Sequence, residues 1–549
     1  MLSPNINSLK SIDALEDELK DFLSDPETTH NYEKSVTWAQ TILKHKKNSS
    51  IARYTMVLNQ IHYANKLAPL QNFDQSINEL ENIIKDDEGF IEAYLMLAKI
   101  YEKTDKQKEF DILKKANFKF PNNYLIMYDL ANLKLYSSGE KHEAVDLFSK
   151  CVEKLPQIPN NWGSLGTAYI FTRELELAKT CFETALAIDP KHLPSMLGVG
   201  VYNYEKANFS RAKEFYTKSL ELSSDSYYGK MNLAYLELLT GNFQKGLEMY
   251  EQRDVNFFLK KYGGAGFKPI LKKNISKNLN QKIVILNEQG LGDDIMFARY
   301  LKPLSELGYD LTFMTQPELI NFFKASPELK KFDIRNKLPE CNPNTFDYRT
   351  FLCSIPYLIS DYFNKQPLPY SIDWTKLATK KNTENGEIKK LLDNQMYKVG
   401  VSWSGNIKHH RHYNRSISLL NFSELFRLKN IQFYVVQKGL LEEERNYLEE
   451  FNNVTICDKY LDDFVDSGFF VSKMNYVVTV DTSLVHLSGT MGQKTGLLLP
   501  KVPDWRWRFE GKQDWYPSVE LYRQEDIDDW KAPLEDIKTR IKSLSSSSG

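Results

Sequence analysis

The spacing of hydrophobic residues differs between the two parts of the chain. Up to about residue 255, apolar positions recur three and four residues apart, as on the buried faces of amphipathic helices. From residue 281 onward, short apolar runs alternate with helical patterns in the order strand, helix, strand. The change predicts an all-α first part followed by an α/β part, in which helices cover both faces of parallel sheets.

Within the helical part, large and small residues recur with a period of about 34 residues. Small residues such as Gly166 and Ala178 fit where two antiparallel helices approach closely, and large ones such as Phe182 fill the gaps between them. The clearest unit comprises Trp162, Leu165, Gly166, Tyr169, Ala178, Phe182, Ala185 and Pro190. This is the tetratricopeptide-repeat (TPR) signature, so residues 1–255 are predicted to form a TPR-type α-solenoid with a concave face and about six repeats. A generic helical bundle is the alternative.

In the second part, the alternation of strand and helix patterns begins at residue 282 and begins again at residue 398. The apolar runs of strand length lie at residues 282–287, 311–314, 398–403, 431–436, 454–456, 476–480 and 495–499. Residues 256–280 are rich in glycine and lysine and are predicted to be a linker. We expect two Rossmann-like domains, at residues 281–395 and 396–543, facing a cleft, and a disordered tail at 544–549. Ligands of such sheets bind beyond the carboxyl ends of the strands.

The composition of the chain argues against several classes of protein. Lysine and arginine number 71 against 72 aspartates and glutamates, so the net charge of -1 argues against a general nucleic-acid binder. No apolar run approaches the ~18 residues of a membrane helix, and the polar, acidic start, Met1 to Lys20, does not resemble a secretory signal. The five scattered cysteines fit a reducing compartment. We expect a cytoplasmic protein with no transmembrane segment and no nucleic-acid partner.

The first predicted strand ends in a glycine-containing turn. Gly290 and Gly292 allow the backbone to pass close to a ligand, and the following helix offers free N–H groups. Asp293 follows directly. Its carboxylate either caps the helix or acts as a general base, and one residue can do both.

A second strand end carries Asp481, Thr482 and Ser483, followed by a helix that includes His486. Thr482 and His486 are four residues apart and share a helical face. Hydroxyl groups and helix N-terminal amides suit a diphosphate, and the histidine can reach a phosphate or a ribose hydroxyl. The alternative is a buried capping turn with a satisfied histidine.

A third strand end opens a basic loop. A cationic loop opposite a helix N-terminus would stabilise a departing nucleoside diphosphate, although an isolated run of charge is more often a solvated loop. The candidates for binding are Lys408, Arg411 and Arg415, together with Gln437 and Lys438 at the end of the next strand. The adjacent His409 and His410 cannot easily share one metal ion, so no metal site is expected.

Taken in order, these motifs resemble a known family. They comprise Asn287–Asp293, Val399–Asn406, Asn414–Ser416, Gln437–Gly439, Val480–His486, Leu499–Trp507 and Trp515–Pro517. The set is similar to the TPR glycosyltransferases, whose catalytic part resembles the bacterial heptosyltransferases, family nine of the glycosyltransferases, with the GT-B fold. The resemblance covers residues 281–530, and the repeats in front match the same architecture.

The resemblance implies a metal-independent transfer from a nucleotide sugar, with no cofactor. The donor would lie mainly on the C-terminal Rossmann-like domain and the acceptor on the N-terminal one. Asp481, Thr482, Ser483 and His486 match the donor-nucleotide turn, and Asp293 matches the aspartate proposed as the base in heptosyltransferases. The basic loop departs from the heptosyltransferase pattern in length and content. Repeat-bearing bacterial relatives include enzymes thought to glycosylate proteins such as flagellin.

Three hypotheses remain open at this stage. In the first, the repeats recruit a polypeptide acceptor and the cleft transfers a sugar to its hydroxyl group. In the second, the protein is a TPR scaffold with a degenerate transferase domain. In the third, the enzyme acts on a glycan or lipopolysaccharide acceptor. The joint presence of Asp293, the Thr482 and His486 pair and the basic loop favours an enzyme.

Overall fold

The computed structural model describes residues 11–24, 32–67, 73–138, 140–253, 281–336, 345–361, 369–406, 412–511 and 515–547. The chain separates into two compact units, Met1–Ile188 and Asp189–Gly549. This boundary falls within the helical array, whereas the sequence predicts a domain boundary at residue 255. The predicted linker at 256–280 lies outside the described residues.

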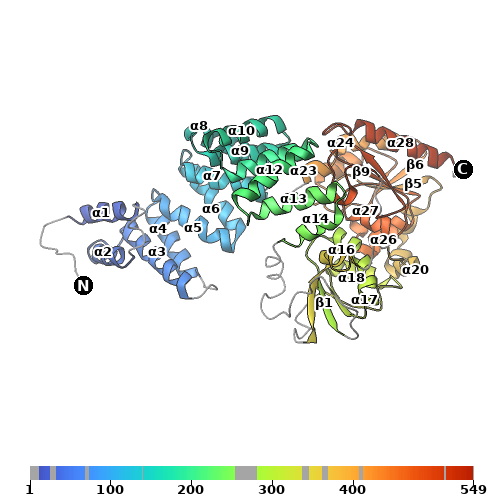
Figure 1. Ribbon diagram of the computed structural model, residues 1–549, viewed down its shortest axis with the longest axis horizontal. Helices are drawn as coiled ribbons and strands as arrows, with labels where there is room; N and C mark the ends of the chain where they lie inside the picture. Colours follow the sequence, from blue (N-terminus) through green and yellow to red (C-terminus); the bar gives the residue numbers. More distant parts are fainter. Residues whose placement is uncertain are drawn as a thin grey trace. The chain divides into compact units, whose positions relative to one another are not determined.

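The first unit is all-helical, as predicted (Figure 1). Its described helices are α1 (Ile12–Ser24), α2 (Tyr32–His45), α3 (Ser50–Leu67), α4 (Asp74–Asp86), α5 (Ile91–Thr104), α6 (Lys106–Lys119), α7 (Tyr124–Leu133), the π-helix η1 (Lys134–Ser138), α8 (Lys141–Lys154), α9 (Pro159–Thr172) and α10 (Leu175–Ile188). A Cβ atom at Gly166 on α9 would lie 2.7 Å from the Phe182 ring on α10. The predicted close approach of a small and a large residue is therefore confirmed.

Two further helical hairpins belong to the second unit. They consist of α11 (Leu193–Glu205), α12 (Phe209–Leu222), α13 (Tyr227–Leu239) and α14 (Phe243–Tyr250). Gly200 meets Tyr216 as Gly166 meets Phe182, because an added Cβ would lie 2.4 Å from the tyrosine ring. The helices of each unit therefore agree with the all-helical, TPR-like repeats that the sequence predicts.

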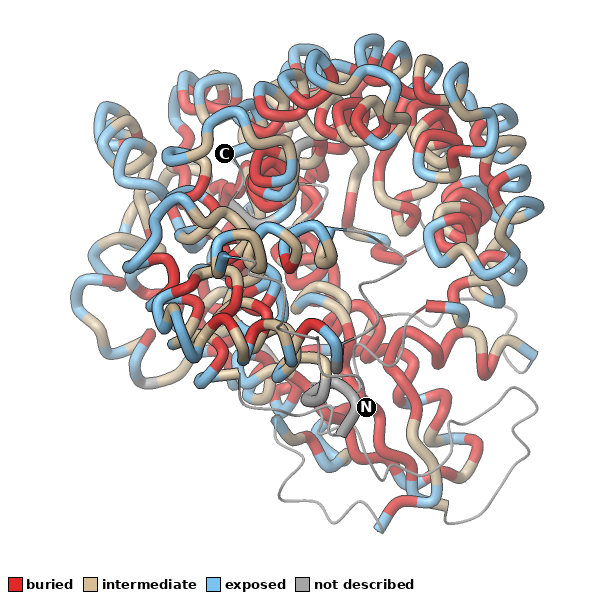
Figure 2. Tube along the Cα trace, turned by 90° about the vertical axis from the view of Figure 1, so that its left-hand side faces the viewer, coloured by how far each residue is buried: buried red, intermediate tan, exposed pale blue. Residues whose placement is uncertain are grey.

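Two parallel sheets form the rest of the second unit. The smaller has the order β3-β2-β1-β4 and the larger the order β10-β9-β8-β5-β6-β7, and every pair of neighbours is parallel. The strands are β1 (Lys282–Leu286), β2 (Asp310–Met314), β3 (Asp333–Arg335), β4 (Tyr348–Phe351), β5 (Tyr397–Ser402), β6 (Ile431–Val435), β7 (Val454–Ile456), β8 (Tyr476–Val480), β9 (Thr495–Leu499) and β10 (Val519–Arg523). The central strands are buried along almost their whole length, as helices on both faces require (Figure 2).

Helices connect and cover these strands. Those of the smaller sheet are α16 (Leu291–Phe297), η2 (Ala298–Tyr300), α17 (Leu301–Glu306), α18 (Pro317–Lys324), η4 (Leu352–Ser354) and α19 (Ile355–Leu358). Three described helices follow the smaller sheet and precede the larger one along the chain: α20 (Trp374–Leu377), α21 (Lys380–Thr383) and α22 (Gly386–Leu392). The larger sheet has α23 (His412–Arg415), α24 (Leu419–Phe422), η5 (Ser423–Arg427), α25 (Glu442–Leu448), η6 (Asp458–Tyr460), α26 (Phe464–Ser472), α27 (Ser483–Thr490), η7 (Trp505–Trp507) and α28 (Lys531–Ser546).

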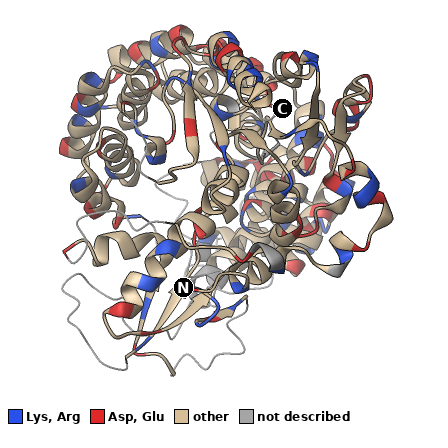
Figure 3. Cartoon of the chain, turned by 90° about the vertical axis from the view of Figure 1, so that its right-hand side faces the viewer, with Lys and Arg blue, Asp and Glu red and all other residues tan. Residues whose placement is uncertain are grey.

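The structure corrects the sequence-based expectations in two places. The hydrophobic pattern does not predict strands β3, β4 and β10, and β10 follows the run at 495–499 that it predicts to be the last strand. Helix α28 continues to Ser546, so the predicted disordered tail is helical at its start. Among the described helices, none is long and apolar enough to cross a lipid bilayer. Both signs of charge are spread over the helices (Figure 3).

Candidate functional site

A cavity of about 550 Å³ lies where strands of both sheets end. Its lining includes residues from the turns that follow five of the strands. They are Gln289 to Asp293 after β1, Gln316 after β2, Gly405 and Asn406 after β5, Asp481 to Ser483 after β8, and Pro500 after β9. The carboxyl ends of the strands therefore face one pocket, which is the position expected for a ligand of parallel sheets.

The last two helical hairpins supply a third wall of this pocket. The lining residues from α11 to α14 are Val201, Tyr204, Glu205, Tyr216, Asn232, Tyr235 and Tyr250. The hairpins are fixed to the larger sheet's segment by aromatic packing, since the rings of Phe209 and Phe509 are 4.7 Å apart. The Phe509 N–H also donates to the Leu239 carbonyl at 3.1 Å. Sequence reasoning did not place repeat residues at the site.

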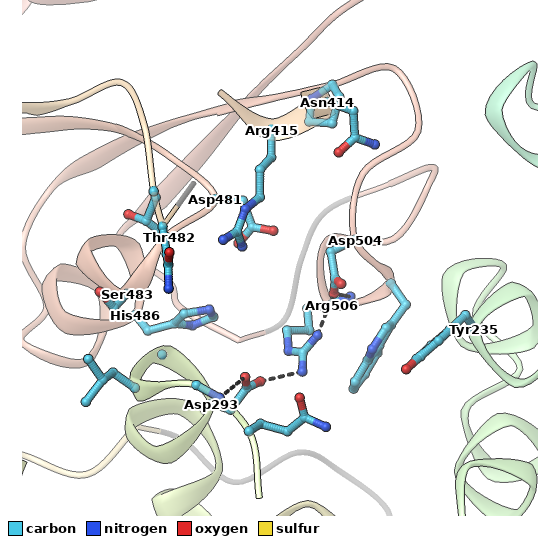
Figure 4. Close-up of a pocket in the computed structure, with 18 of the residues that line it drawn as sticks. Tyr235, Asp293, Asn414, Arg415, Asp481, Thr482, Ser483, His486, Asp504 and Arg506 are labelled. Carbon is cyan, nitrogen blue, oxygen red and sulfur yellow. Dashed lines mark hydrogen bonds and ion pairs between the residues drawn. The ribbon is translucent and has the colours of Figure 1, made fainter. Parts of the chain in front are cut away.

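Asp293 lies in the first turn of α16 and points into the pocket (Figure 4). One carboxylate oxygen accepts a hydrogen bond from the Gly290 N–H at 3.2 Å, and the other forms an ion pair with Arg506. The Arg506 guanidinium also pairs with Asp504 at 2.7 Å. Asp293 therefore does cap its helix, and it has a cationic partner that the sequence did not reveal.

Asp504 and Arg506 are functional candidates that the sequence analysis missed. Both residues lie in the segment Leu499–Trp507, which contributes to the resemblance without a role for any single residue. The Arg506 guanidinium packs 4.6 Å from the Trp505 ring and is almost buried. An arginine between two tryptophans was the available signal, because a charge among buried aromatic rings needs partners.

His486 is buried on α27 and lines the pocket. Its Nδ1 lies 3.0 Å from the Tyr516 hydroxyl, and its ring stacks on Trp507 at 5.5 Å. Burial, and then the neighbouring Arg506 and Arg299, lower the pKa of His486 to about 3. The imidazole is therefore neutral near pH 7 and can offer a ligand hydrogen bonding but no charge.

Gly292 and α27 touch across the pocket. A Cβ atom at position 292 would lie 2.7 Å from Cδ2 of His486 and 3.3 Å from Cα of Ser483. Real Cβ atoms do not approach other atoms as closely as the first distance. The glycine thus permits the β1–α16 turn to pack directly on the β8–α27 turn, and the two predicted sites are brought together.

The β8–α27 turn combines a cap with a titratable carboxylate. The Thr482 hydroxyl accepts a hydrogen bond from the Leu484 N–H at 3.3 Å, so it is the N-cap of α27. Burial and the nearby Asp504 carboxylate raise the pKa of Asp481 to about 6, against the opposing effect of Arg415. Asp481, Thr482 and Ser483 all line the pocket, as predicted from their place after the strand.

Arg415 and Asn414 present unused hydrogen-bond donors. Both residues line the pocket from α23, and Asn414 is 4% exposed. The Arg415 Nε and the Asn414 Nδ2 are buried and have no hydrogen-bond partner among the described residues. Buried donors without partners are costly, so an acceptor-rich ligand would stabilise them. Lys408 and Arg411, the other candidates on this loop, lie outside the described residues.

Gln437 and Lys438 do not line the pocket. The Gln437 side-chain oxygen accepts hydrogen bonds from the N–H groups of Trp403 and Ser404, each at 3.1 Å. It therefore orders the loop that carries Gly405. Lys438 is exposed, and its ammonium group lies 3.4 Å from the Asp462 carbonyl.

Glu288, the residue before the pocket loop, is buried in a separate network. Its carboxylate receives two hydrogen bonds from Arg253, at 2.6 and 2.8 Å, and one from the Cys353 N–H at 3.2 Å. Arg253 also donates to Ser354 and Glu251. This network fastens the end of the helical array to the start of the pocket loop.

Charge is mixed within the pocket. The described lining contains two arginines, Arg415 and Arg506, and four carboxylates, Glu205, Asp293, Asp481 and Asp504. In the part of the chain that the structure describes, no three histidine, cysteine, aspartate or glutamate side chains are grouped as metal ligands would be. The positive charge available to an anion therefore comes from the guanidinium groups.

Comparison with known proteins finds one repeat, in the first unit and the start of the second. No curated protein matches the chain. Similar solved structures include MamA (22% identity, TM-score 0.26, 28% of this chain and 89% of that chain). A thermophilic TPR protein of Thermus thermophilus is 20% identical, with a TM-score of 0.28 over 32% of this chain and 98% of that chain. Pseudomonas aeruginosa pilF is 14% identical, with a TM-score of 0.34 over 40% of this chain and 97% of that chain. Residues 159–192 match the family model described as a tetratricopeptide repeat.

Proposed function

We propose that the protein is a metal-independent glycosyltransferase of the GT-B type, which transfers a sugar from a nucleotide sugar to a hydroxyl group of a protein acceptor. One observation carries the proposal. The carboxyl ends of strands from two parallel sheets meet at one pocket, whose lining holds both the carboxylate of Asp293 and buried donors that lack partners among the described residues. The resemblance of the strand-end motifs to glycosyltransferases supports the same reaction.

The donor diphosphate would lie against α27 and α23. Thr482 and Ser483 provide a hydroxyl-rich helix N-terminus, which favours negative charge. Arg415 and Asn414 add buried donors whose hydrogen-bonding capacity is unused among the described residues. As the bond between sugar and diphosphate breaks, negative charge grows on the leaving group, and a fixed guanidinium stabilises it most at that point.

The acceptor would enter beside the helical hairpins. Its hydroxyl group must lose a proton as its oxygen attacks the anomeric carbon, and Asp293 is a carboxylate that lines the pocket. The tyrosines and Asn232 on the hairpin wall are suited to contacting a polypeptide or a sugar. The TPR match at residues 159–192 supports a protein as the partner.

A second candidate is a TPR scaffold that binds a protein without catalysis. The family match favours it, because that match covers a repeat and not the α/β part. A transferase acting on a glycan or lipopolysaccharide is a third candidate, in which the hairpin wall would hold a saccharide. These candidates differ in whether a nucleotide sugar binds and in which acceptor is modified.

A ligand panel tests the proposal. We expect a nucleotide sugar among UDP, ADP, GDP and CDP sugars to raise the melting temperature in the presence of EDTA, with stabilisation of about 2.7 kcal/mol at a hundred times its Kd. Arg415→Gln should reduce the shift strongly, whereas Lys438→Gln, which removes an exposed charge outside the pocket, should leave it unchanged. No stabilisation by any member would contradict the transferase and favour the scaffold.

A further inference from the structure

We propose that Arg506 exchanges its partner when the donor binds: it holds Asp293 while the donor site is empty and turns to the diphosphate when the donor arrives. The exchange would release Asp293 to act as the base only after the donor is in place. This inference rests on the proposed function, because it assigns a role within the same pocket.

The first observation is that both oxygens of Asp293 are occupied. One accepts the Gly290 N–H, and the other is paired with Arg506 (Figure 4). A carboxylate in this arrangement has its proton-accepting oxygen covered by a guanidinium. An acceptor hydroxyl group would compete with Arg506 for this oxygen, so departure of the guanidinium would open it to the acceptor.

The second observation is that Arg506 has capacity to rearrange. Its Nη1 is paired with Asp504 at 2.7 Å, its Nη2 with Asp293, and its buried Nε has no hydrogen-bond partner among the described residues. The guanidinium carries five N–H donors in a planar fork, a geometry that matches phosphate oxygens. Arg506 can therefore bind a phosphate through Nε and Nη2 while Nη1 stays on Asp504.

The third observation is the aromatic surface under the guanidinium. Its central carbon lies 4.6 Å from the Trp505 ring and 5.8 Å from the Phe297 ring. A planar cation stacked on aromatic faces keeps favourable contacts as it slides across them. The same surface would support Arg506 before and after the exchange.

The electrostatic balance of the pocket explains why a diphosphate would displace Asp293. Arg506 and Arg415 are the two cationic side chains in the described lining, which also contains four carboxylates. A diphosphate adds further negative charge, and phosphate oxygens form strong charge-assisted hydrogen bonds with arginine. An arginine drawn toward the phosphate leaves a carboxylate beside the entering acceptor.

The exchange fits a balanced transfer step. The acceptor hydroxyl oxygen forms a bond to the anomeric carbon, and its proton passes to Asp293. The bond between that carbon and the diphosphate oxygen breaks, and its electron pair leaves with the nucleoside diphosphate. Arg506 and Arg415 then face the charge that develops on the leaving group.

The test is a double-mutant cycle on the full-length protein, with donor affinity measured by calorimetry. If Arg506 must leave Asp293 to reach the donor, Asp293→Asn removes the competing carboxylate and should tighten binding of the nucleotide sugar by roughly fivefold or more. Arg506→Gln should weaken binding by about 30-fold. In the double variant, Asp293→Asn should give no gain, because the exchanging group is absent.

Two further variants control for folding and charge. Arg506→Lys retains the cation without the planar fork and should recover only part of the affinity. Arg508→Gln removes a nearby arginine that does not line the pocket and should leave the affinity unchanged. Melting curves of all variants confirm that each is folded.

The outcomes separate the inference from the proposed function. If the ion pair between Asp293 and Arg506 is permanent, Asp293→Asn should leave donor binding unchanged or weaken it. That result would overturn the exchange but not the proposed transferase. If the wild-type protein binds no nucleotide sugar of the panel, both the transferase and the exchange are refuted. Tighter binding that persists in the Arg506→Gln background would also refute the exchange.

Discussion

Replacing Glu288 by leucine tests whether the buried ion pair with Arg253 holds the pocket loop to the helical array. The exposed fractions of the Arg253 and Glu288 side chains are 2% and 0%. The substitution removes both hydrogen bonds from the guanidinium to the carboxylate, as well as the bond from the Cys353 N–H. It leaves a buried arginine whose remaining charged partner is Glu251, 2.7 Å away.

The magnitude follows from that arrangement. Breaking a buried pair by removing one partner costs about 3–5 kcal/mol, because the other charge stays buried. Glu251 still neutralises part of the charge, so we expect the lower limit, about 3 kcal/mol. Replacing both residues, as Arg253→Met with Glu288→Leu, removes the charge as well and should be close to neutral. The double variant should therefore be more stable than the single one.

Thermal melting provides the assay. With an unfolding entropy of about 2.1 cal/mol/K per residue, a loss of about 3 kcal/mol in a unit as long as Asp189–Gly549 lowers Tm by about 4 °C. Donor affinity, measured at a temperature where both variants are folded, should be lower in Glu288→Leu than in the double variant, because the pocket loop is held less firmly. If Glu288→Leu melts within about 1 °C of the wild type, or if the double variant is the less stable one, the reasoning from buried charge is refuted.

Three further results are expected. Asp293→Asn should lower turnover about 10²–10⁴-fold without weakening donor binding, and wild-type turnover would show that Asp293 is not the base. Because burial raises the pKa of Asp481 to about 6, above its unfolded value of about 3.9, its contribution to folding stability falls as pH rises through that window. Binding of a nucleotide sugar, whose diphosphate does not titrate there, should also weaken from pH 5 to 7, by at most about tenfold per unit; an equal pH dependence in Asp481→Asn would contradict this. Gly292→Ala should cost about 1–3 kcal/mol and weaken donor binding, because its Cβ would lie 2.7 Å from His486, whereas Gly290→Ala, whose nearest atom is 3.8 Å away, should be silent.

The strands that the hydrophobic pattern does not predict share one feature, which is their position in the sheets. All three unpredicted strands, β3, β4 and β10, lie at sheet edges. Strand β10, Val519-Glu-Leu-Tyr-Arg523, contains two charged residues and one buried residue, and β3 also contains one buried residue. The central strands are apolar on both faces and therefore produce continuous hydrophobic runs. A prediction based on such runs finds every central strand, and among the edge strands it finds only β7.

The candidate site divides in a similar way. Asp293, Thr482 and His486 could be found because each follows a recognisable strand end, and chain topology brings those ends together. Arg506 could not be assigned a role from its neighbours in sequence, since its partner Asp293 is more than two hundred residues away. The role of Gln437 stays a prediction: a polar residue after a strand can bind either a ligand or the adjacent loop, and its described contacts are to the adjacent loop.

The membership of the last two hairpins in the α/β unit has a consequence for engineering the protein. Helices α11 to α14 belong to the unit that begins at Asp189, and their side chains complete the pocket. A chimera that joins a foreign repeat array at residue 255 would discard one wall of the pocket along with the repeats. A junction at Ile188 would instead keep every described side chain that lines the pocket.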